Sequence, residues 1–209
     1  MKLALALYLA TASAFGAAFT NGSFETNNGC NPPSGSWILL GTGSTCMTGW
    51  AVSQGNVDYS NALWVASNGT HSVDLNGETV GGVSQIFDTN ASHSFLVTFD
   101  MAGNIAGLPV VKTLTVSAAG TSQAYSFDST GRSYSNMGWV TMTFTFNSDS
   151  SGSTTLQFLS TSIAGCCTGP VIDNVTVIDL GGAGSVPEPW SVLLVGPALV
   201  FLALARRWR

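Results

Sequence analysis

The amino-acid sequence predicts an all-β domain, an antiparallel β-sandwich, between two apolar ends. From Phe19 onward, short segments rich in Val, Phe and Thr alternate with turns rich in Gly, Asn and Ser. No long window of this body repeats its apolar residues with the period of a helix. The two ends differ because each has a continuous apolar run. These observations divide the chain into a signal peptide, a sandwich domain, a Gly-rich linker and a C-terminal signal, at residues 1–18, 19–180, 181–186 and 187–209.

The N-terminal end has the features of a secretory signal peptide. Lys2 precedes an apolar run from Leu3 to Ala10, and small residues follow near a cleavage site. Cleavage after Ala18 fits this pattern, and a rival site lies after Ala14. We expect a short signal helix, too short to span a membrane, and export of the body to an oxidising compartment.

Period-2 alternation in the body predicts the two faces of each sheet. Alternate apolar residues share one face, which we expect to face the core while polar neighbours face water. Several such runs at short spacing are typical of an antiparallel sandwich. The residues expected to face inward are Val73, Leu75, Phe95, Val97, Phe99, Met101, Val140, Met142, Phe144, Phe146, Leu156 and Phe158.

The charge of the body excludes nucleic acid as a partner. Only 8% of the whole chain is charged. Between Phe19 and Val186, ten acidic residues stand against Lys112 and Arg132, so two minus ten leaves a net charge of −8. Such a surface has no basic patch for phosphates.

The C-terminal end has three parts in a fixed order. A turn formed by Pro187, Glu188 and Pro189 precedes an apolar run from Trp190 to Ala205. This run is short for a transmembrane helix, which needs roughly 20 residues. A basic cap ends the chain and would hold that end on the cytoplasmic side; it consists of Arg206, Arg207 and Arg209.

This tripartite end resembles the PEP-CTERM sorting signal of Gram-negative bacteria. The resemblance implies an inner-membrane-anchored precursor, delivered by the export machinery and processed by the protease-transpeptidase exosortase. The mature protein would then lack the apolar run and lie at the cell surface or in the extracellular matrix. An ordinary C-terminal membrane anchor is the alternative, although such an anchor would not need the Pro-Glu-Pro turn.

The body resembles a second group, the choice-of-anchor C exported domains, which are close to the DUF642 family. The landmarks include FTNGSFE at 19–25, TGWAV at 48–52, HSVDLNG at 71–77, FDMAGN at 99–104 and GPVIDNVTV at 169–177. The resemblance implies a galactose-binding-like jelly roll, a fold that often binds carbohydrate. A Cys- and Pro-containing insert at 26–47 departs from the pattern.

Two carboxylates are predicted to meet at one corner of this fold. Glu25 closes the NGSFE segment, which we expect to be the first strand, and Asp173 opens the last strand. Asp173 shares its parity with Val171 and Val175, so we expect it to face inward and to need compensation. The resemblance implies a structural calcium bound by Glu25 and Asp173. Alternatively, both carboxylates accept backbone N–H bonds at loop ends.

Four cysteines allow three pairings. Cys166 and Cys167 are neighbours, and a bond between them would be strained. Cys30 and Cys46 could close a local loop, but the expected proximity of the first and last strands favours two crosslinks between the two loops. Zinc is the alternative, although export favours disulfides.

No catalytic motif is present, so we expect that the protein is not an enzyme. His71 and His93 are not part of a metal-protease or nucleophile pattern, and no spacing singles out a pair of carboxylates for glycoside hydrolysis. Seven aromatic residues could form a sugar-binding platform, or could instead pack in the core or at its rim: Trp37, Trp50, Tyr59, Trp64, Tyr125, Tyr134 and Trp139. Of these, Tyr59, Trp64 and Tyr134 are expected to be the most exposed and are the candidates for binding sugar.

The sequence thus favours an exported, exosortase-processed, non-catalytic surface or matrix protein that binds extracellular polysaccharide. A structural or adhesive envelope protein with no saccharide ligand is the first alternative. A secreted glycoside hydrolase is the second, less favoured one.

Overall fold

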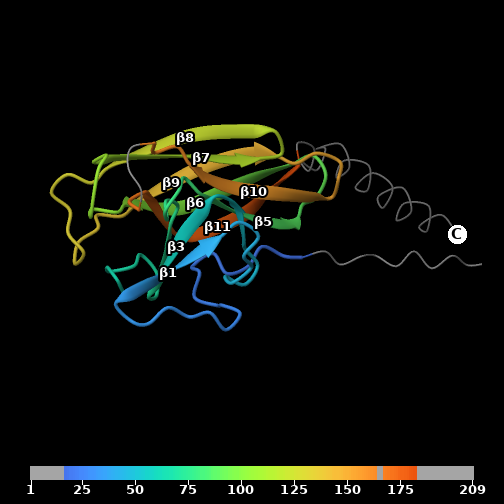
Figure 1. Cartoon of the computed structure of the whole chain (residues 1–209). Coiled ribbons are helices and arrows are strands. Elements are labelled where there is room, and N and C mark those ends of the chain that lie inside the picture. Colours follow the sequence, from blue (N-terminus) through green and yellow to red (C-terminus); the bar gives the residue numbers. More distant parts are fainter. Residues whose placement is uncertain (1–16, 164–166, 183–209) are drawn as a thin grey trace, which may run out of the picture.

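Residues 17–163 and 167–182, which the computed structural model describes, form eleven β-strands (Figure 1). The signal-peptide run of residues 1–16, Cys166 and the tail from residue 183 lie outside the described residues. The strands are β1 Ser36–Gly41, β2 Ala51–Gln54, β3 Asn56–Asn61, β4 His71–Asp74, β5 Gly82–Asp88, β6 His93–Gly103, β7 Val111–Ala118, β8 Thr121–Asp128, β9 Val140–Asn147, β10 Ser153–Ser160 and β11 Pro170–Gly182.

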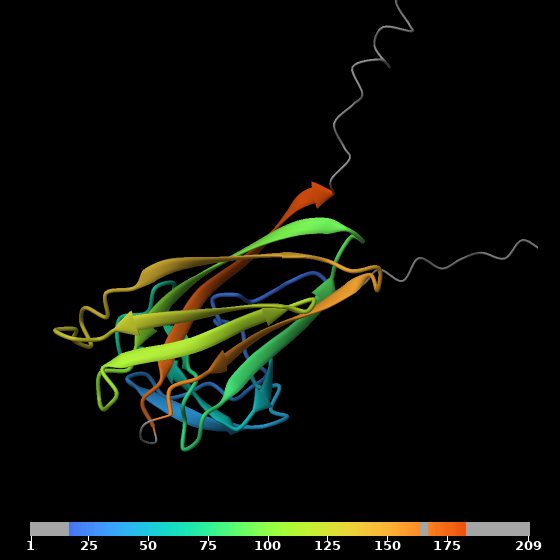
Figure 2. The same cartoon turned by 90° about the horizontal axis from the view of Figure 1, so that it is seen from above.

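The strands form two stacked sheets, which confirms the predicted antiparallel sandwich. One sheet has six strands in the order β1-β3-β4-β11-β6-β9, and the other has five in the order β2-β5-β10-β7-β8. Neighbouring strands are antiparallel throughout. Figures 1 and 2 show the layer of β7, β8 and β10 lying over the layer of β6, β9 and β11.

The core lies between the sheets, where the alternating apolar residues meet. Phe99 of β6 packs edge to face against Phe158 of β10, with ring centroids 5.0 Å apart. Because this contact joins the two sheets, the Phe99 side of β6 is the inner face. The predicted inward residues of β4, β6 and β10 are buried, and so are Phe144 and Phe146 of β9, whereas Val140 at the start of β9 is exposed.

A β-bulge in β11 overturns the predicted inward orientation of Asp173. Asp173 pairs with Asp100, and the next pair is Thr176 with Thr98, so β11 has one extra residue. Asp100 alternates with Phe99 and therefore lies on the outer face, as Asp173 does. The bulge, in which Asn174 has φ 52°, reverses which alternate residues of β11 face the core. Val177, which follows the bulge, therefore faces the core opposite Val97.

The segments before β2 also differ from the prediction. Phe19–Glu25 is not a strand, although it lies beside β11 as expected, with the Val175 N–H donating to the Gly22 carbonyl at 2.8 Å. The insert at 26–47 contains a strand of its own, β1, which pairs with β3 at the edge of the six-stranded sheet.

The disulfide joins Cys30 to Cys46, so the predicted crosslinks from these cysteines to the loop before β11 are wrong. The physical reason is local pairing within the insert. The Asn28 N–H donates to the Cys46 carbonyl at 2.8 Å, and the two Cα atoms of the disulfide lie 5.9 Å apart. This separation lies in the usual range for a disulfide. Closing a loop of this size stabilises the fold by roughly 3 kcal/mol.

Both boundaries of the described domain lie at the same end of the sandwich. The Ala17 carbonyl accepts a hydrogen bond from the Asp88 N–H at 2.9 Å, and Gly182 pairs with His93 across the β5–β6 connection. Gly181 and Gly182, predicted as linker, therefore belong to β11. Within residues 17–163 and 167–182, no helix is long and apolar enough to cross a membrane.

Candidate functional site

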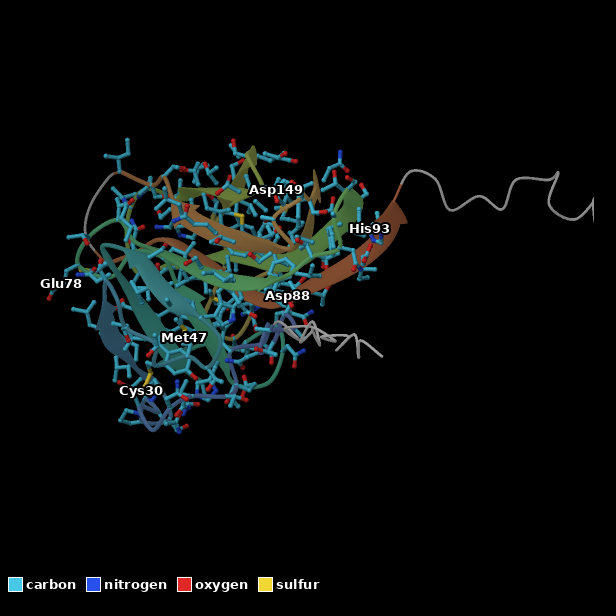
Figure 3. The ribbon with its side chains drawn as sticks, turned by 90° about the vertical axis from the view of Figure 1, so that its right-hand side faces the viewer. Cys30, Met47, Glu78, Asp88, His93 and Asp149 are labelled. Carbon is cyan, nitrogen blue, oxygen red and sulfur yellow. A yellow bond between two sulfur atoms is a disulfide. The ribbon has the colours of Figure 1, made fainter. Side chains whose placement is uncertain are left out.

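A cavity of about 950 Å³ opens on the outer face of the six-stranded sheet. It lies at the end where β4 finishes and β11 begins, opposite to the end that holds both domain boundaries. Figure 3 labels Glu78, at the cavity rim, and His93, beside the end of β11, on opposite sides of the molecule. The side chains that matter most for its chemistry are Trp37, Leu39, Asp58, Trp64, Glu78 and Tyr134.

Strand β1 supplies one wall. Trp37 pairs with Ser60 and Leu39 with Asp58, so both apolar side chains lie on the outer face, while Leu40 is buried on the inner one. Trp37 remains 50% exposed. The insert that departs from the family pattern therefore provides an aromatic ring that contacts solvent in the cavity.

The opposite wall comes from two connections that fold over the sheet. Trp64, between β3 and β4, donates its Nε1–H to the Ser72 hydroxyl at 2.8 Å. The Val65 N–H donates to the Tyr134 carbonyl at 2.8 Å, which joins the β3–β4 and β8–β9 connections. The rings of Trp64 and Tyr134 lie 6.1 Å apart.

Of the three aromatic residues predicted to be exposed, only Tyr134 is, at 42%. Trp64 is 4% exposed because it belongs to the hydrophobic core cluster and its indole N–H is bonded to Ser72, although it still lines the cavity. Tyr59 lies in the core, where its hydroxyl donates to the Phe24 carbonyl at 2.7 Å and its ring stacks on His71. Its predicted role in a sugar-binding platform is therefore wrong, because its position in β3 places it on the inner face.

A buried carboxylate, that of Asp74, lies at the end of the sheet that holds the cavity. Asp74 of β4 accepts hydrogen bonds from the N–H groups of Asn76 and Gly169, both at 2.9 Å, and from the Asn104 side-chain amide at 2.7 Å. Burial nevertheless raises the pKa of Asp74 to about 6. Lys112, also fully buried, donates its Nζ–H groups to the carbonyls of Gly107 and Thr168, both at 2.9 Å.

Asp58 is the carboxylate that faces the cavity. It lies opposite Asp74 in the β3–β4 ladder and is 8% exposed. Among the residues that the structure describes, none donates a hydrogen bond to its carboxylate. Burial, and then the nearby charges of Asp74 and Glu78, together raise the pKa of Asp58 to about 7. The cavity thus holds a carboxylate for which the described part of the protein provides no partner.

Glu25 and Asp173 flank a single segment of the β3–β4 connection. One Glu25 oxygen accepts the N–H groups of Thr70 at 2.8 Å and His71 at 2.7 Å, and the other lies 3.0 Å from His71 Nδ1. Asp173 accepts the Asn68 N–H at 2.8 Å. Both carboxylates therefore accept backbone N–H bonds from residues 68–71. This is the arrangement that the alternative to calcium predicts.

The two carboxylates at this corner differ in how well their charges are compensated. Burial, with a smaller contribution from the Glu25 carboxylate, raises the pKa of Asp173 to about 7. Burial acts on Glu25 in the same direction, but hydrogen bonds from His71 and Thr70 hold the pKa of Glu25 below its ordinary value. A Cβ atom on Gly69 would lie 2.4 Å from the Glu25 carboxylate, so the segment approaches that group as closely as glycine allows. Within the described ranges, no three His, Cys, Asp or Glu residues are grouped closely enough to hold a metal. Calcium here stays a prediction.

Comparison with known proteins places the sandwich in a family. A family model described as a protein of unknown function, DUF642, matches residues 17–178. The chain belongs to the DUF642 family. This DUF642 protein is also 29% identical over 170 residues to halomucin from Haloquadratum walsbyi, an alignment that covers 76% of the chain. The chain corresponds to only 2% of the length of halomucin.

Several solved carbohydrate-binding modules are similar to the chain at low scores. A family 61 module in complex with β-1,4-galactotriose has a TM-score of 0.46 and 17% identity, over 78% of this chain and 98% of the module. A family 35 module from Paenibacillus barcinonensis has a TM-score of 0.42 and 21% identity, over 68% and 98% of the two chains. At such scores, the ligand class has to be argued from the cavity of the DUF642 protein itself.

Reasoning from sequence missed Asp58 and did not place Trp37 among the three most exposed aromatic residues. Trp37 lies in SWILLG, where four consecutive apolar residues hide the alternation between inner and outer faces. Asp58 did have a usable signal, since Val57 and Tyr59 on either side of it are the inward residues of β3. What the sequence did not show was that connections distant in the chain would cover Asp58.

Proposed function

We propose that this DUF642 protein is an exported, non-catalytic surface or matrix protein that binds polysaccharide in the cavity beside β1. The observation that carries the proposal is the exposure of Trp37 and Tyr134 in one cavity that also holds Asp58 and Asn104. Aromatic faces can pack on the C–H faces of sugar rings, while a few polar groups fix the hydroxyls. The volume is at the upper end of the range for small-molecule sites.

Export, membrane anchoring of the precursor and processing by exosortase belong to the same proposal. They rest on the signal-peptide features of residues 1–18 and on the Pro-Glu-Pro, apolar and Arg-rich parts of the tail. The position of the cavity is compatible with them. Gly182, the last residue of β11, lies beside His93 at the end of the sandwich opposite to Glu78. A chain held by its C-terminus would therefore present the cavity away from the membrane.

A structural or adhesive protein without a saccharide ligand is the alternative, and a glycoside hydrolase is less favoured. Hydrolysis needs two carboxyl groups that face one sugar. Asp74, the neighbour of Asp58, is fully buried and its oxygens accept bonds from Asn76, Asn104 and Gly169. Asp74 therefore cannot reach a bound sugar, so a hydrolytic pair in this cavity would have to be Asp58 and Glu78, which both line it. Cleavage of a bound glycan that is lost in both Asp58→Asn and Glu78→Gln would favour the hydrolase.

Replacing Trp37 with Ala tests the proposed binding. We expect Trp37→Ala to weaken binding to the best ligand on a glycan array by at least tenfold, because the exposed ring of the β1 wall is lost. The matched control is Ile86→Ala, which removes a 65% exposed apolar side chain of β5 outside the cavity. Binding would be quantified by calorimetry on the purified exported protein. Failure to bind any glycan would favour the structural or adhesive alternative.

Calcium at Glu25 and Asp173 is a separate proposal with its own measurement. The two carboxylates, which both contact residues 68–71, are oxygen ligands of the kind that Ca²⁺ prefers. An ion that binds only the folded state stabilises it, by about 2.7 kcal/mol at 100 times its dissociation constant. We expect Ca²⁺ to raise the Tm of chelator-treated protein by several degrees, and Asp173→Asn to abolish the increase.

The control for calcium is Asp149→Asn, since Asp149 is an exposed acid in the turn between β9 and β10 (Figure 3). This variant should respond to Ca²⁺ like the unmodified protein. If the Tm of the unmodified protein is the same in Ca²⁺ and in excess chelator, no structural calcium is bound. The backbone N–H bonds to Glu25 and Asp173 would then be the whole function of these carboxylates.

A further inference from the structure

Among the described residues, the walls of the cavity have negative charge and no accessible positive charge. Asp58 and Glu78 line it, and none of its described lining residues is Lys, Arg or His. Lys112 lies below the cavity, but its side chain is fully buried and its Nζ–H groups are bonded to Gly107 and Thr168. On the described walls, a bound ligand therefore meets carboxylates and no cation.

Asp58 in particular is a buried acidic group that a cation would stabilise. Its side chain is more than nine-tenths buried, lines the cavity and accepts no hydrogen bond from the described residues. Its nearest charged neighbours, Asp74 on β4 and Glu78 after β4, are both acids. A buried charge without a partner is costly. A positive group of a ligand would compensate it.

The aromatic walls favour the same chemistry. Trp37, Trp64 and Tyr134 all line the cavity, and the negative face of an aromatic ring attracts a cation, most strongly for Trp. The excess of acids over bases in the body adds a long-range attraction for positively charged ligands. One ammonium group could thus contact a ring face and the Asp58 carboxylate together.

We infer that the cavity takes a polysaccharide of amino sugars whose amino groups are free and protonated. This inference rests on the proposed function and names its ligand class. A neutral sugar brings no charge to Asp58, and a uronic acid would set another carboxylate against Asp58 and Glu78. A small polyamine would satisfy the carboxylates but would leave the exposed faces of Trp37 and Tyr134 without a sugar ring to pack on.

Binding should also release protons from the protein. Because the pKa of Asp58 is raised to about 7, part of this group is protonated near neutral pH in the free protein, and an ammonium group favours its ionised form. The groups that face Asp58 are Asp74, with Lys112 behind it, and Glu78. None of these supplies a free positive charge that would cancel the effect.

Titration calorimetry with three probes tests the inference. The probes are a hexamer of glucosamine, the same hexamer fully N-acetylated, and a galacturonic acid hexamer, at pH 5.5 and physiological salt. At this pH the glucosamine amino groups carry their protons and Asp58, with its raised pKa, is still protonated in the free protein. We expect the glucosamine hexamer to bind at least tenfold more tightly than the other two. Its apparent enthalpy should change with the ionisation enthalpy of the buffer, as proton release requires.

Variants separate a specific contact from general charge attraction. Asp58→Asn should weaken binding of the glucosamine hexamer at least tenfold and change binding of the acetylated hexamer less than threefold. Asp88→Asn, which removes an exposed acid at the other end of the molecule (Figure 3), should change neither. Equal losses from both variants would show a non-specific effect and overturn the inference.

Two further outcomes would also overturn it and are distinguishable from each other. If the acetylated hexamer, or another neutral glycan on the array, binds as tightly as the glucosamine hexamer, the proposed polysaccharide binding is supported and the preference for amino sugars is contradicted. If no glycan of any charge binds the protein, the proposed function falls together with the inference.

Discussion

Replacing Asp74 with Ala is expected to lower the free energy of unfolding by about 3–5 kcal/mol, the range for breaking a buried charged network from one side. Three hydrogen-bond donors, from Asn76, Gly169 and Asn104, would lose their acceptor inside the protein. The Lys112 ammonium group would also lose its nearby negative charge. Urea denaturation, monitored by tryptophan fluorescence, measures the change.

Two controls separate this network from a general effect of losing an acid. Asp88→Ala removes an exposed carboxylate and should change the free energy of unfolding by less than about 0.5 kcal/mol. In the double variant of Asp74→Ala with Lys112→Met, the second change should cost less than it does alone, because no unpaired ammonium remains. A loss below about 1 kcal/mol for Asp74→Ala would contradict the role assigned to this carboxylate.

Replacing Asp58 with Asn is expected to stabilise the protein at pH 7.5 and to leave it nearly unchanged at pH 4. The pKa of Asp58 is raised from an ordinary value of 3.8 to about 7 in the folded protein, by burial first and then by Asp74 and Glu78. The folded state therefore binds this proton more tightly than the unfolded state does. Stability from this group is complete below about pH 4 and is lost as the pH rises through about 7.

The expected gain for Asp58→Asn at pH 7.5 is on the order of 2 kcal/mol, because water in the cavity screens part of the charge. Tm values between pH 4 and pH 8 measure the effect as the difference between the two proteins, which cancels the titration of other groups. Parallel Tm profiles over that range would contradict it. Asp58→Asn should thus be more stable at pH 7.5 and should bind the glucosamine hexamer more weakly, as expected where a binding group lowers the stability of the fold.

Much of the sandwich could be predicted from the sequence because strand alternation is a local property. Phe95, Val97, Phe99 and Met101 alternate with polar neighbours, and all four are buried between the sheets. The resemblance to a jelly roll also implied that Glu25 and Asp173 share a corner, and both do contact residues 68–71. The first conclusion needed no knowledge of how distant segments pack, whereas the second took that knowledge from the fold that the resemblance implies.

Local alternation fails where the chain adds a residue or forms a structure of its own. The bulge after Asp173 reverses the parity of β11, and nothing in DNVTV marks it, so the outer position of Asp173 was missed. The insert at 26–47 pairs with itself, which brings Cys30 to Cys46 instead of to the loop before β11. Both outcomes depend on backbone pairing that the order of residue types does not specify.

The chain's own residues are thus sufficient to predict several of its strands and the acidity of its body. The cavity needed contacts between segments far apart in the sequence. Trp37 of the insert, Trp64 of the β3–β4 connection and Tyr134 of the β8–β9 connection meet only when the sheets are formed. The same packing buries Asp58 beside Asp74, and no described residue donates a hydrogen bond to the Asp58 carboxylate. The sequence could not show this burial, because desolvation depends on all the atoms around a group and not on its neighbours in the chain.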